Sequence, residues 1–187
     1  MKFPVLETPR LRLVQIGPEH IDALFGILSK DEVTEYYGMD SLQDRHIAEK
    51  MVSAFQVGFE AQRSYRWGLE LKETGEFIGT IGLNNLNPGA KKSEIGYELH
   101  PDFWRRGLAK EAVLEVLRYS FEELGLYRMG AVTYPANDAS NTMLKKLGFK
   151  QEGVLRGYLF QRGTSHDALI FSLLEPEWKA LRVNGNG

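Results

Sequence analysis

Residues 95–112 read IGYELHPDFWRRGLAKEA, and the pattern of apolar residues changes twice within this segment. Its beginning belongs to an alternating run over residues 93–99 that is typical of a strand. A short loop follows, and apolar residues then recur at helical spacing from Gly107 to Leu124. Gly125 is well suited to end this helix. The segment therefore predicts a strand, a short loop and the longest helix of the chain in direct succession.

The junction between this loop and this helix is suited to binding an anion. The first turn of a helix has N–H groups without partners in the helix, and it carries the positive end of the helix dipole. Arg105, Arg106 and Lys110 add positive charge there, and the small residues Gly107 and Ala109 would let a phosphate approach the backbone. In the alternative interpretation, both arginines are solvated and Gly107 only turns the chain. The chain has neither GxxxxGK[ST] nor GxGxxG, so neither a P-loop nucleotidase nor a dinucleotide fold is indicated.

Outward from this segment, the chain alternates between strand and helix patterns, and we expect several hairpins and one strand–helix–strand crossover in the second half of the chain. Strands are expected at residues 11–16, 65–71, 77–86, 93–99, 127–134, 149–155 and 168–174, and helices at 18–28, from Ser41, at 107–124 and just before Gly148. We expect a single α/β domain over residues 1–180, with a mixed sheet flanked by helices, and a disordered tail over residues 181–187.

The composition excludes several classes of protein. The 187 residues include 23 Lys and Arg against 25 Asp and Glu, a formal charge of -2, so no basic field attracts nucleic acid. No apolar stretch is long enough to cross a bilayer and the N-terminus lacks a signal-peptide pattern, which favours a soluble cytoplasmic protein. The absence of cysteine excludes disulfides and thiol nucleophiles. The four histidines have no metal-ligand spacing, so no metal site is expected.

A known family has a similar junction between loop and helix. The hexamer WRRGLA at residues 104–109 resembles the pyrophosphate loop of the GNAT acetyltransferases, Q/R-x-x-G-x-G/A. Trp104 departs from the Gln or Arg of that pattern, as is common in the RimJ/RimL branch, whose members acetylate protein N-termini. Further segments resemble that branch in the same order along residues 8–178: TPRLRL at 8–13, SEIGY at 93–97, NDASN at 137–141, LGF at 147–149 and EW at 177–178.

The resemblance implies a GNAT fold, in which a mixed, largely antiparallel sheet is splayed between two parallel strands, here 93–99 and 127–134. Acetyl-CoA would bind in that V-shaped opening and transfer its acetyl group directly to an amine in a ternary complex. The pyrophosphate would rest on the loop, and the pantetheine arm would pair with the strand backbone. Cofactor contacts are therefore expected at Glu98, Leu99, His100, Arg105, Arg106, Gly107, Leu108, Ala109, Lys110 and Asn137.

A serine and two glutamates are candidates for moving protons. By resemblance to RimL-like enzymes, Ser140 would donate a proton to the departing CoA thiolate, although Asn137 and Ser140 also suit a helix cap. Glu94 and Glu98 are the candidates for the base. In a strand they share a face but lie about 13 Å apart at ~3.3 Å per residue, so both cannot serve one amine. Glu94 is preferred because several GNAT enzymes place a base acting through water there; the alternative for each is an exposed strand carboxylate.

The cost of deprotonation indicates the acceptor. At pH 7, removing the proton costs about 1.4 kcal/mol for an α-amine and about 4.6 kcal/mol for a lysine. This difference favours an α-amine, and the resemblance to the RimJ/RimL branch implies the N-terminal α-amine of a protein, such as a ribosomal protein. By the same resemblance, Tyr36 and Tyr37 would line the acceptor pocket. The alternatives are a small-molecule amine (a polyamine, a drug or an amino acid) and a non-catalytic acyl-CoA-binding module. We expect a monomer or homodimer that binds neither nucleic acid nor membrane.

Overall fold

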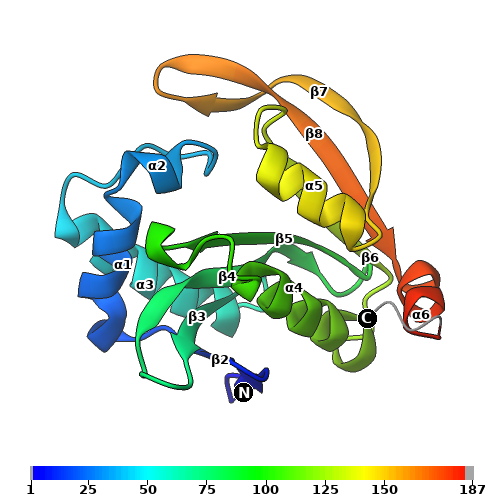
Figure 1. Ribbon diagram of the computed structural model, residues 1–187, viewed down its shortest axis with the longest axis horizontal. Helices are drawn as coiled ribbons and strands as arrows, with labels where there is room; N and C mark the ends of the chain where they lie inside the picture. Colours follow the sequence, from blue (N-terminus) through cyan, green and yellow to red (C-terminus); the bar gives the residue numbers. More distant parts are fainter. Residues whose placement is uncertain (1, 184–187) are drawn as a thin grey trace.

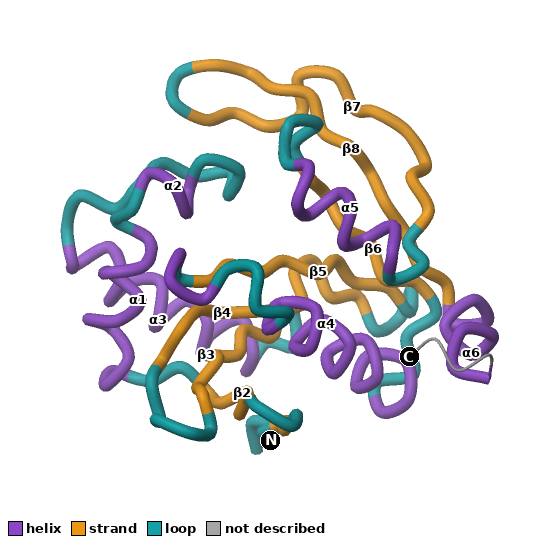
Figure 2. Tube along the Cα trace, viewed as in Figure 1, coloured by secondary structure: helices purple, strands orange, loops and turns teal. Residues whose placement is uncertain are grey.

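The computed structural model describes residues 2–183, which form one sheet flanked by helices (Figure 1, Figure 2). The strands are β1 (Leu6–Glu7), β2 (Leu11–Gln15), β3 (Tyr65–Leu71), β4 (Phe77–Asn87), β5 (Lys92–Leu99), β6 (Arg128–Thr133), β7 (Lys150–Gln161) and β8 (Thr164–Leu174). The helices are α1 (Ile21–Leu28), α2 (Asp31–Thr34), α3 (Arg45–Glu60), α4 (Leu108–Arg118), α5 (Asp138–Lys146) and α6 (Glu175–Val183). Within residues 2–183, no helix combines the length and the hydropathy that a membrane span requires.

The eight strands are hydrogen-bonded in the order β1-β2-β3-β4-β5-β6-β8-β7. Each neighbouring pair is antiparallel except β5 and β6, which are parallel. α4 connects this parallel pair, because parallel neighbours cannot be joined by a tight turn. The predicted fold class, a mixed and largely antiparallel sheet flanked by helices, is therefore confirmed.

The parallel strands β5 and β6 stay together over a short distance only. Their register consists of Lys92↔Arg128, Ser93↔Met129 and Glu94↔Gly130. Beyond these pairs β5 continues beside β4 and β6 continues beside β8, so the sheet divides into two arms (Figure 1). α4 lies along the arm that contains β5, and α5 lies along the arm that contains β8. The two arms enclose the V-shaped opening that the resemblance implies.

The two faces of the sheet differ because side chains alternate between them. Odd-numbered residues of the central strands, such as Trp67 and Leu83, are buried in the same apolar cluster as the inner side of α4. On the other face, Arg66 of β3 lies over the ring of Phe55 in α3. A side chain at Gly68 would meet Phe77 and Ile16, which belong to the apolar cluster of α1 and α3. That second face carries glycines and polar side chains, and it contributes to the site described below.

The hairpin of β7 and β8 is attached to the segment between α2 and α3. Gln161, at the end of β7, is buried and donates from Nε2 to the carbonyl oxygens of Thr34 and Met39, both at 2.7 Å. Its Oε1 accepts a hydrogen bond from the Tyr134 hydroxyl at 2.5 Å. Three segments that are distant in sequence are thereby joined at one side chain, and this contact fixes the end of the hairpin.

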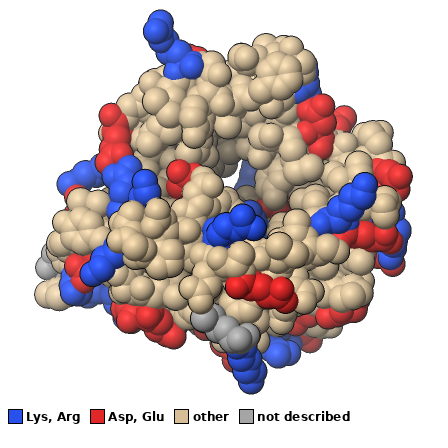
Figure 3. Space-filling model, turned by 180° about the vertical axis from the view of Figure 1, so that it is seen from behind, with Lys and Arg blue, Asp and Glu red and all other residues tan. Residues whose placement is uncertain are grey.

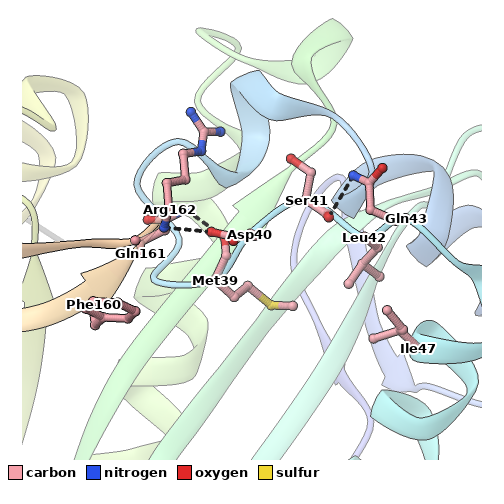
Figure 4. A pocket seen from close by; sticks show the side chains of 10 residues that line it. Met39, Asp40, Ser41, Leu42, Gln43, Ile47, Phe160, Gln161 and Arg162 are labelled. Carbon is pink, nitrogen blue, oxygen red and sulfur yellow. Dashed lines mark hydrogen bonds between the residues drawn. The ribbon is translucent and has the colours of Figure 1, made fainter.

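An open pocket lies beside this attachment (Figure 4). The N–H of Arg162 donates to Oδ1 of Asp40 at 2.9 Å along one side of the pocket. Leu42, Ile47 and Phe160 supply apolar lining. This pocket has no lining residue in common with the cavity between the arms.

One predicted helix start is wrong. α3 begins at Arg45 and not at Ser41, because Asp44 caps it by accepting from the N–H of His46, whereas the Ser41 hydroxyl bonds to Asp31. The bounds predicted for the helix over 107–124 agree with the structure to within one residue, but this helix consists of α4 followed by a π-helical turn over residues 119–123.

The predicted strands at 149–155 and 168–174 are too short. β7 continues to Gln161 and β8 begins at Thr164, because pairing within the hairpin extends to its tip although β7 is exposed over nearly its whole length. The predicted tail also begins too early. α6 extends to Val183, so residues 181–183 are helical, and residues 184–187 lie outside the described part of the chain.

Candidate active site

A cavity of about 530 Å³ lies between the two arms. The end of β5, the loop before α4, the starts of α4 and α5, and the segment from α2 to Tyr37 form its walls. Seen from behind, the molecule is hollowed between its arms (Figure 3). The predicted site residues that line the cavity are Glu98, Leu99, Arg105, Gly107, Leu108, Ala109, Lys110, Asn137 and Ser140. Glu94, His100 and Arg106 are not among its lining residues.

The loop before α4 has the backbone shape of an anion site. Gly107 directly precedes α4 with a φ of 75°, in the left-handed region that favours glycine, and Arg105 has a φ of 59°. The N–H of Glu111 donates to the carbonyl of Gly107 at 3.1 Å. The N–H groups before it belong to the first turn, where no helical carbonyl precedes them, so they can hold a phosphate. Arg105 and Lys110 line the cavity beside them.

The N-terminal segment supports this loop. Arg10 donates from Nη1 to the carbonyl of Arg106 at 2.9 Å and from Nε to Oε2 of Glu111 at 2.7 Å. Thr8 also donates to Glu111, at 2.5 Å. Burial acts to raise the pKa of Glu111, but the hydrogen bonds from Thr8 and Arg10 outweigh it and lower that pKa. The Arg106 guanidinium lies over the ring of Phe103 at 5.3 Å.

The edge of β5 that faces the opening offers backbone groups for strand-like pairing. The N–H of His100 donates to the carbonyl of Ile78 in β4 at 2.8 Å. Because successive residues of a strand bond to opposite sides, the backbone of Leu99 is turned toward the opening, and that of Glu98 toward β4. The Leu99 carbonyl accepts from Nε1 of Trp104 at 2.8 Å. Of the three residues around which a pantetheine arm is expected to pair, only Leu99 therefore presents its N–H toward the opening, and the N–H groups of Glu98 and His100 are turned toward β4.

Asn137 and Ser140 have separate roles at the start of α5. Asn137 caps the helix, and its Oδ1 accepts from the N–H of Ser140 at 3.3 Å. The Ser140 hydroxyl lies 2.7 Å from the hydroxyl of Tyr97 on β5. This contact joins the two arms across the opening. Burial raises the pKa of Tyr97 to about 12, although the hydrogen bond with Ser140 acts to lower it, so this phenol keeps its proton at neutral pH. Sequence reasoning missed Tyr97, because its alternation in the strand indicates only a core residue.

Glu98 lies in the wall of the cavity with one carboxylate oxygen free. The residue is 6% exposed, and Oε1 accepts a hydrogen bond from the hydroxyl of Thr80. Oε2 is buried and has no hydrogen-bond partner among the described residues, and Nη1 of Arg66 is 3.6 Å away from it. Burial raises the pKa of Glu98. The positive charge of Arg66 and the hydroxyl groups of Thr80 and Tyr37 act to lower that pKa, but they do not outweigh the burial. A buried, unpaired carboxylate oxygen is costly, and a cationic or hydrogen-bonding ligand would relieve that cost.

Glu94 lies at the closed end of the V. It pairs with Gly130 of β6 at the last parallel position, is half-buried, and accepts a hydrogen bond from Nδ2 of Asn85 at 3.0 Å. The structure thus separates the two candidate bases. It places Glu98, and not the preferred Glu94, in the same cavity as Ser140.

The wall opposite α4 includes tyrosines and acidic residues. Tyr36 and Tyr37 line the cavity, as the sequence suggests for an acceptor pocket, and Tyr36 lies 5.8 Å from the ring of Tyr134. Glu32 and Glu35 line it as well. Sequence reasoning missed both glutamates, because a helix of four residues has no detectable apolar period.

Comparison with known proteins identifies the family. Residues 10–150 match the acetyltransferase (GNAT) domain. The chain is 44% identical to the uncharacterised N-acetyltransferase YoaA of Bacillus subtilis, over 93% of this chain and 98% of YoaA. It is 35% identical to YdaF of the same species, provisionally named a ribosomal N-acetyltransferase, over 56% of this chain and 57% of YdaF. The structure of Mycobacterium smegmatis RimJ in complex with CoA-disulfide has a TM-score of 0.83 and 23% identity, and the match covers 98% of this chain and 94% of RimJ.

The sheet that divides between two parallel strands, with a helix start suited to an anion at the opening, is the architecture implied by the resemblance to acetyltransferases, and the family match agrees with it. Within that class, the chain belongs to the GNAT acetyltransferase family, and it transfers an acetyl group from acetyl-CoA. The names of YdaF and RimJ agree with the predicted RimJ/RimL-like branch. The first turn of α4, Arg105, Lys110 and the open edge at Leu99 fit the pyrophosphate and the pantetheine arm. In the part of the chain that the structure describes, no three His, Asp or Glu side chains gather as metal ligands.

Proposed function

We propose that this enzyme acetylates the N-terminal α-amine of proteins or peptides by direct attack of the amine on acetyl-CoA. The observation that carries the proposal is one cavity lined by a hydroxyl pair and by a buried carboxylate, one oxygen of which has no hydrogen-bond partner among the described residues. The pair is Ser140 with Tyr97, and the carboxylate is that of Glu98. Both lie beside the end of β5, next to the loop that fits the pyrophosphate.

Each of these groups has one task in the proposed reaction. Oε2 of Glu98 accepts a proton from the acceptor amine, whose nitrogen forms the new bond to the acetyl carbon. When the carbon–sulfur bond breaks, the Ser140 hydroxyl gives its proton to the thiolate. The Tyr97 hydroxyl, 2.7 Å from Ser140, keeps its own proton and can donate a hydrogen bond to the serine oxygen. Solvent then restores the serine proton, and Glu98 releases the amine proton to solvent. Asn137 caps α5 and keeps Ser140 in position.

The cost of deprotonation supports an α-amine. The difference of ~2.4 pKa units between an α-amine and a lysine favours the α-amine by about 3 kcal/mol before any pocket contact is made. Burial raises the pKa of Glu98. The pKa of this carboxylate is therefore closer to the pKa of an α-amine than the pKa of an exposed carboxylate would be, which favours proton transfer from the amine. The name of YdaF, which refers to ribosomal N-acetylation, supports the same acceptor class.

A small cationic amine is the second candidate. Glu32 and Glu35 line the cavity on its acceptor side, and two carboxylates there favour a substrate with more than one positive charge. A polyamine would meet this condition, as would a peptide with a basic residue near its N-terminus.

Release of CoA from acetyl-CoA distinguishes these acceptors. One peptide has a free α-amine and no lysine, and its partner has a blocked α-amine and one lysine; spermidine is the third acceptor. We expect the first peptide to give the highest kcat/KM. A higher kcat/KM with spermidine would favour the small-amine alternative, and no release with any amine would support a non-catalytic module.

A further inference from the structure

The face of the sheet behind Glu98 is built around one buried arginine. Arg66 of β3 extends across β4 and β5, over Gly82 and Gly96, which pair with each other in the register. A Cβ at Gly82 would lie 2.8 Å from Nε of Arg66. A Cβ at Gly96 would lie 3.0 Å from Nδ2 of Asn84, which the guanidinium contacts. The two glycines therefore leave a channel that fits the arginine side chain.

The guanidinium is held at the end of this channel. Nη1 donates to the hydroxyl of Thr80 at 3.3 Å and to the carbonyl of Gly96 at 3.2 Å, and Nη2 donates to Oδ1 of Asn84 at 3.1 Å. The ring of Phe55 covers it at 5.8 Å, and the side chain is only 10% exposed. A side chain with this many contacts has little freedom to move toward or away from its neighbours.

The guanidinium of Arg66 lies close to Glu98 but makes no hydrogen bond to Oε2 of that glutamate. Thr80 donates to Oε1 of Glu98, and Nη1 of Arg66 lies 3.6 Å from Oε2, beyond hydrogen-bond distance. A pair built only for stability would be expected to close this gap, because a buried ion pair offsets its desolvation through direct hydrogen bonds. Here the charge is near, and Oε2 still has no hydrogen-bond partner within residues 2–183.

We propose that Arg66 is a positioning residue for acetyl transfer, which acts through Thr80 and Glu98 to hold Oε2 toward the acceptor amine. The proposal rests on the proposed function, in which an amine reaches Glu98 in this cavity. Thr80 fixes one carboxylate oxygen, Arg66 supplies the balancing positive charge, and the remaining oxygen is left for the acceptor. Arg66 itself does not line the cavity and needs no contact with substrate.

The pH dependence of the reaction tests this role. The charged or titratable groups that act on Glu98 or line the same cavity are Arg66, Tyr37, Tyr36, Tyr97, Glu32, Glu35, Arg105 and Lys110. Of these, Arg66 is the positive charge that acts most strongly to keep Glu98 ionised. Its removal should let Glu98 hold a proton to higher pH. An opposite charge at this distance typically lowers a carboxyl pKa by about 1–3 units, so the acidic limb should move upward by about one pH unit or more.

The experiment measures kcat/KM from pH 5.5 to pH 9 with acetyl-CoA and a peptide that has a free α-amine. Arg66→Met should lose about tenfold or more at low pH and recover at high pH, with the affinity for CoA unchanged by calorimetry. Arg66→Lys keeps the positive charge, so its acidic limb should lie between that of the wild type and that of Arg66→Met. Asn84→Ala removes one contact of the guanidinium but leaves its charge, so it should move the acidic limb in the same direction by a smaller amount. This variant replaces Arg66→Met in the test if Arg66→Met does not fold. Arg12→Met, at an exposed position of β2, is the matched control.

Glu98→Gln separates the two levels of the proposal. If Glu98→Gln loses activity and Arg66→Met has no further effect in that background, Arg66 acts through Glu98. If Glu98→Gln loses activity but Arg66→Met leaves the limb in place, the role of Arg66 is wrong and the proposed base stands. A normal profile for Glu98→Gln would overturn both.

Discussion

Asn137 and Ser140 lie on the same turn of α5, but their side chains have different partners. Asn137 accepts from the backbone of Ser140, and the Ser140 hydroxyl reaches Tyr97 on the other arm. We predict that Ser140→Ala lowers kcat by about tenfold or more and leaves stability nearly unchanged, because a proton donor is lost. Asn137→Ala should instead cost about 1 kcal/mol of unfolding free energy. Steady-state kinetics and urea unfolding of both variants check this, and a normal kcat for Ser140→Ala would exclude the serine as the donor.

Glu98 and Glu94 differ in burial, and this difference predicts a pH effect. Burial raises the pKa of Glu98, so its carboxylate form is present above that raised pKa and is lost as the pH falls through it. We predict that Glu98→Gln lowers kcat/KM by about 100-fold and removes the acidic limb of the pH profile. Glu94→Gln, the matched change at the closed end of the V, should keep both the rate and the limb. The opposite result would place the base at Glu94.

At the scale of single residues, the sequence predicts which residues belong to the candidate site better than it predicts which side chains they contact. The loop residues, Ser140 and the two glutamates can all be proposed from residue type and position. The spacing of Glu94 and Glu98 cannot decide between them, because both share a face of β5. The two glutamates differ in the structure because β5 and β6 separate just after Glu94, so that Glu98 lines the cavity and Glu94 does not. Arg66 and Tyr97 were missed because their contacts join residues that are distant in sequence.

Among the elements, the β7–β8 hairpin depends on one buried side chain. Gln161 holds its tip through bonds to Thr34, Met39 and Tyr134. Gln161→Glu would place a carboxylate against two carbonyl oxygens, and we predict a loss of about 1–3 kcal/mol of unfolding free energy. Arg162→Ala, at the neighbouring exposed position, should lose less, since its contacts are shared with water. Urea unfolding measures both, and equal losses would contradict the role of Gln161.

The loop before α4 makes a separate prediction about CoA binding. A Cβ at Gly107 would lie 3.5 Å from Nη2 of Arg10, which is an ordinary van der Waals contact. Two other features therefore restrict the residue type at position 107, the φ of 75° and the space that a phosphate needs beside the backbone. Gly107→Glu should abolish CoA binding, because its carboxylate repels the pyrophosphate. Gly107→Ala should cost about 1 kcal/mol of stability through the backbone alone and keep part of the affinity. Calorimetry with CoA decides, and an unchanged Kd in folded Gly107→Glu would remove the loop from the site.

The elements that the sequence predicts well are those with one buried face. The β5–loop–α4 segment changes from a period of two to a helical period, so both elements are visible in the sequence. The outer half of β7 has no such face, since residues such as Tyr158 and Phe160 are exposed, and its pairing is set by the turn and by Gln161. α2 is too short to show a period. Tertiary contacts decide these parts of the chain.

At the scale of the whole molecule, a net charge of -2 conceals a separation of charge within the cavity. Arg105 and Lys110 lie at the start of α4, where the anionic part of CoA fits. Glu32, Glu35 and Glu98 lie on the side where the amine is expected. One cavity therefore has both basic and acidic lining residues and can attract an anion and a cation, although the molecule has no strong overall field.

The measurement that tests the central claim most directly is tandem mass spectrometry of one peptide that carries both a free α-amine and an internal lysine. The peptide is incubated with the enzyme and acetyl-CoA at pH 7, with Glu98→Gln as the control for uncatalysed transfer. We predict that the acetyl group is found on the α-amine, because its deprotonation costs about 3 kcal/mol less than that of lysine. Acetylation confined to the lysine, or equal in the enzyme and the Glu98→Gln control, would contradict the account.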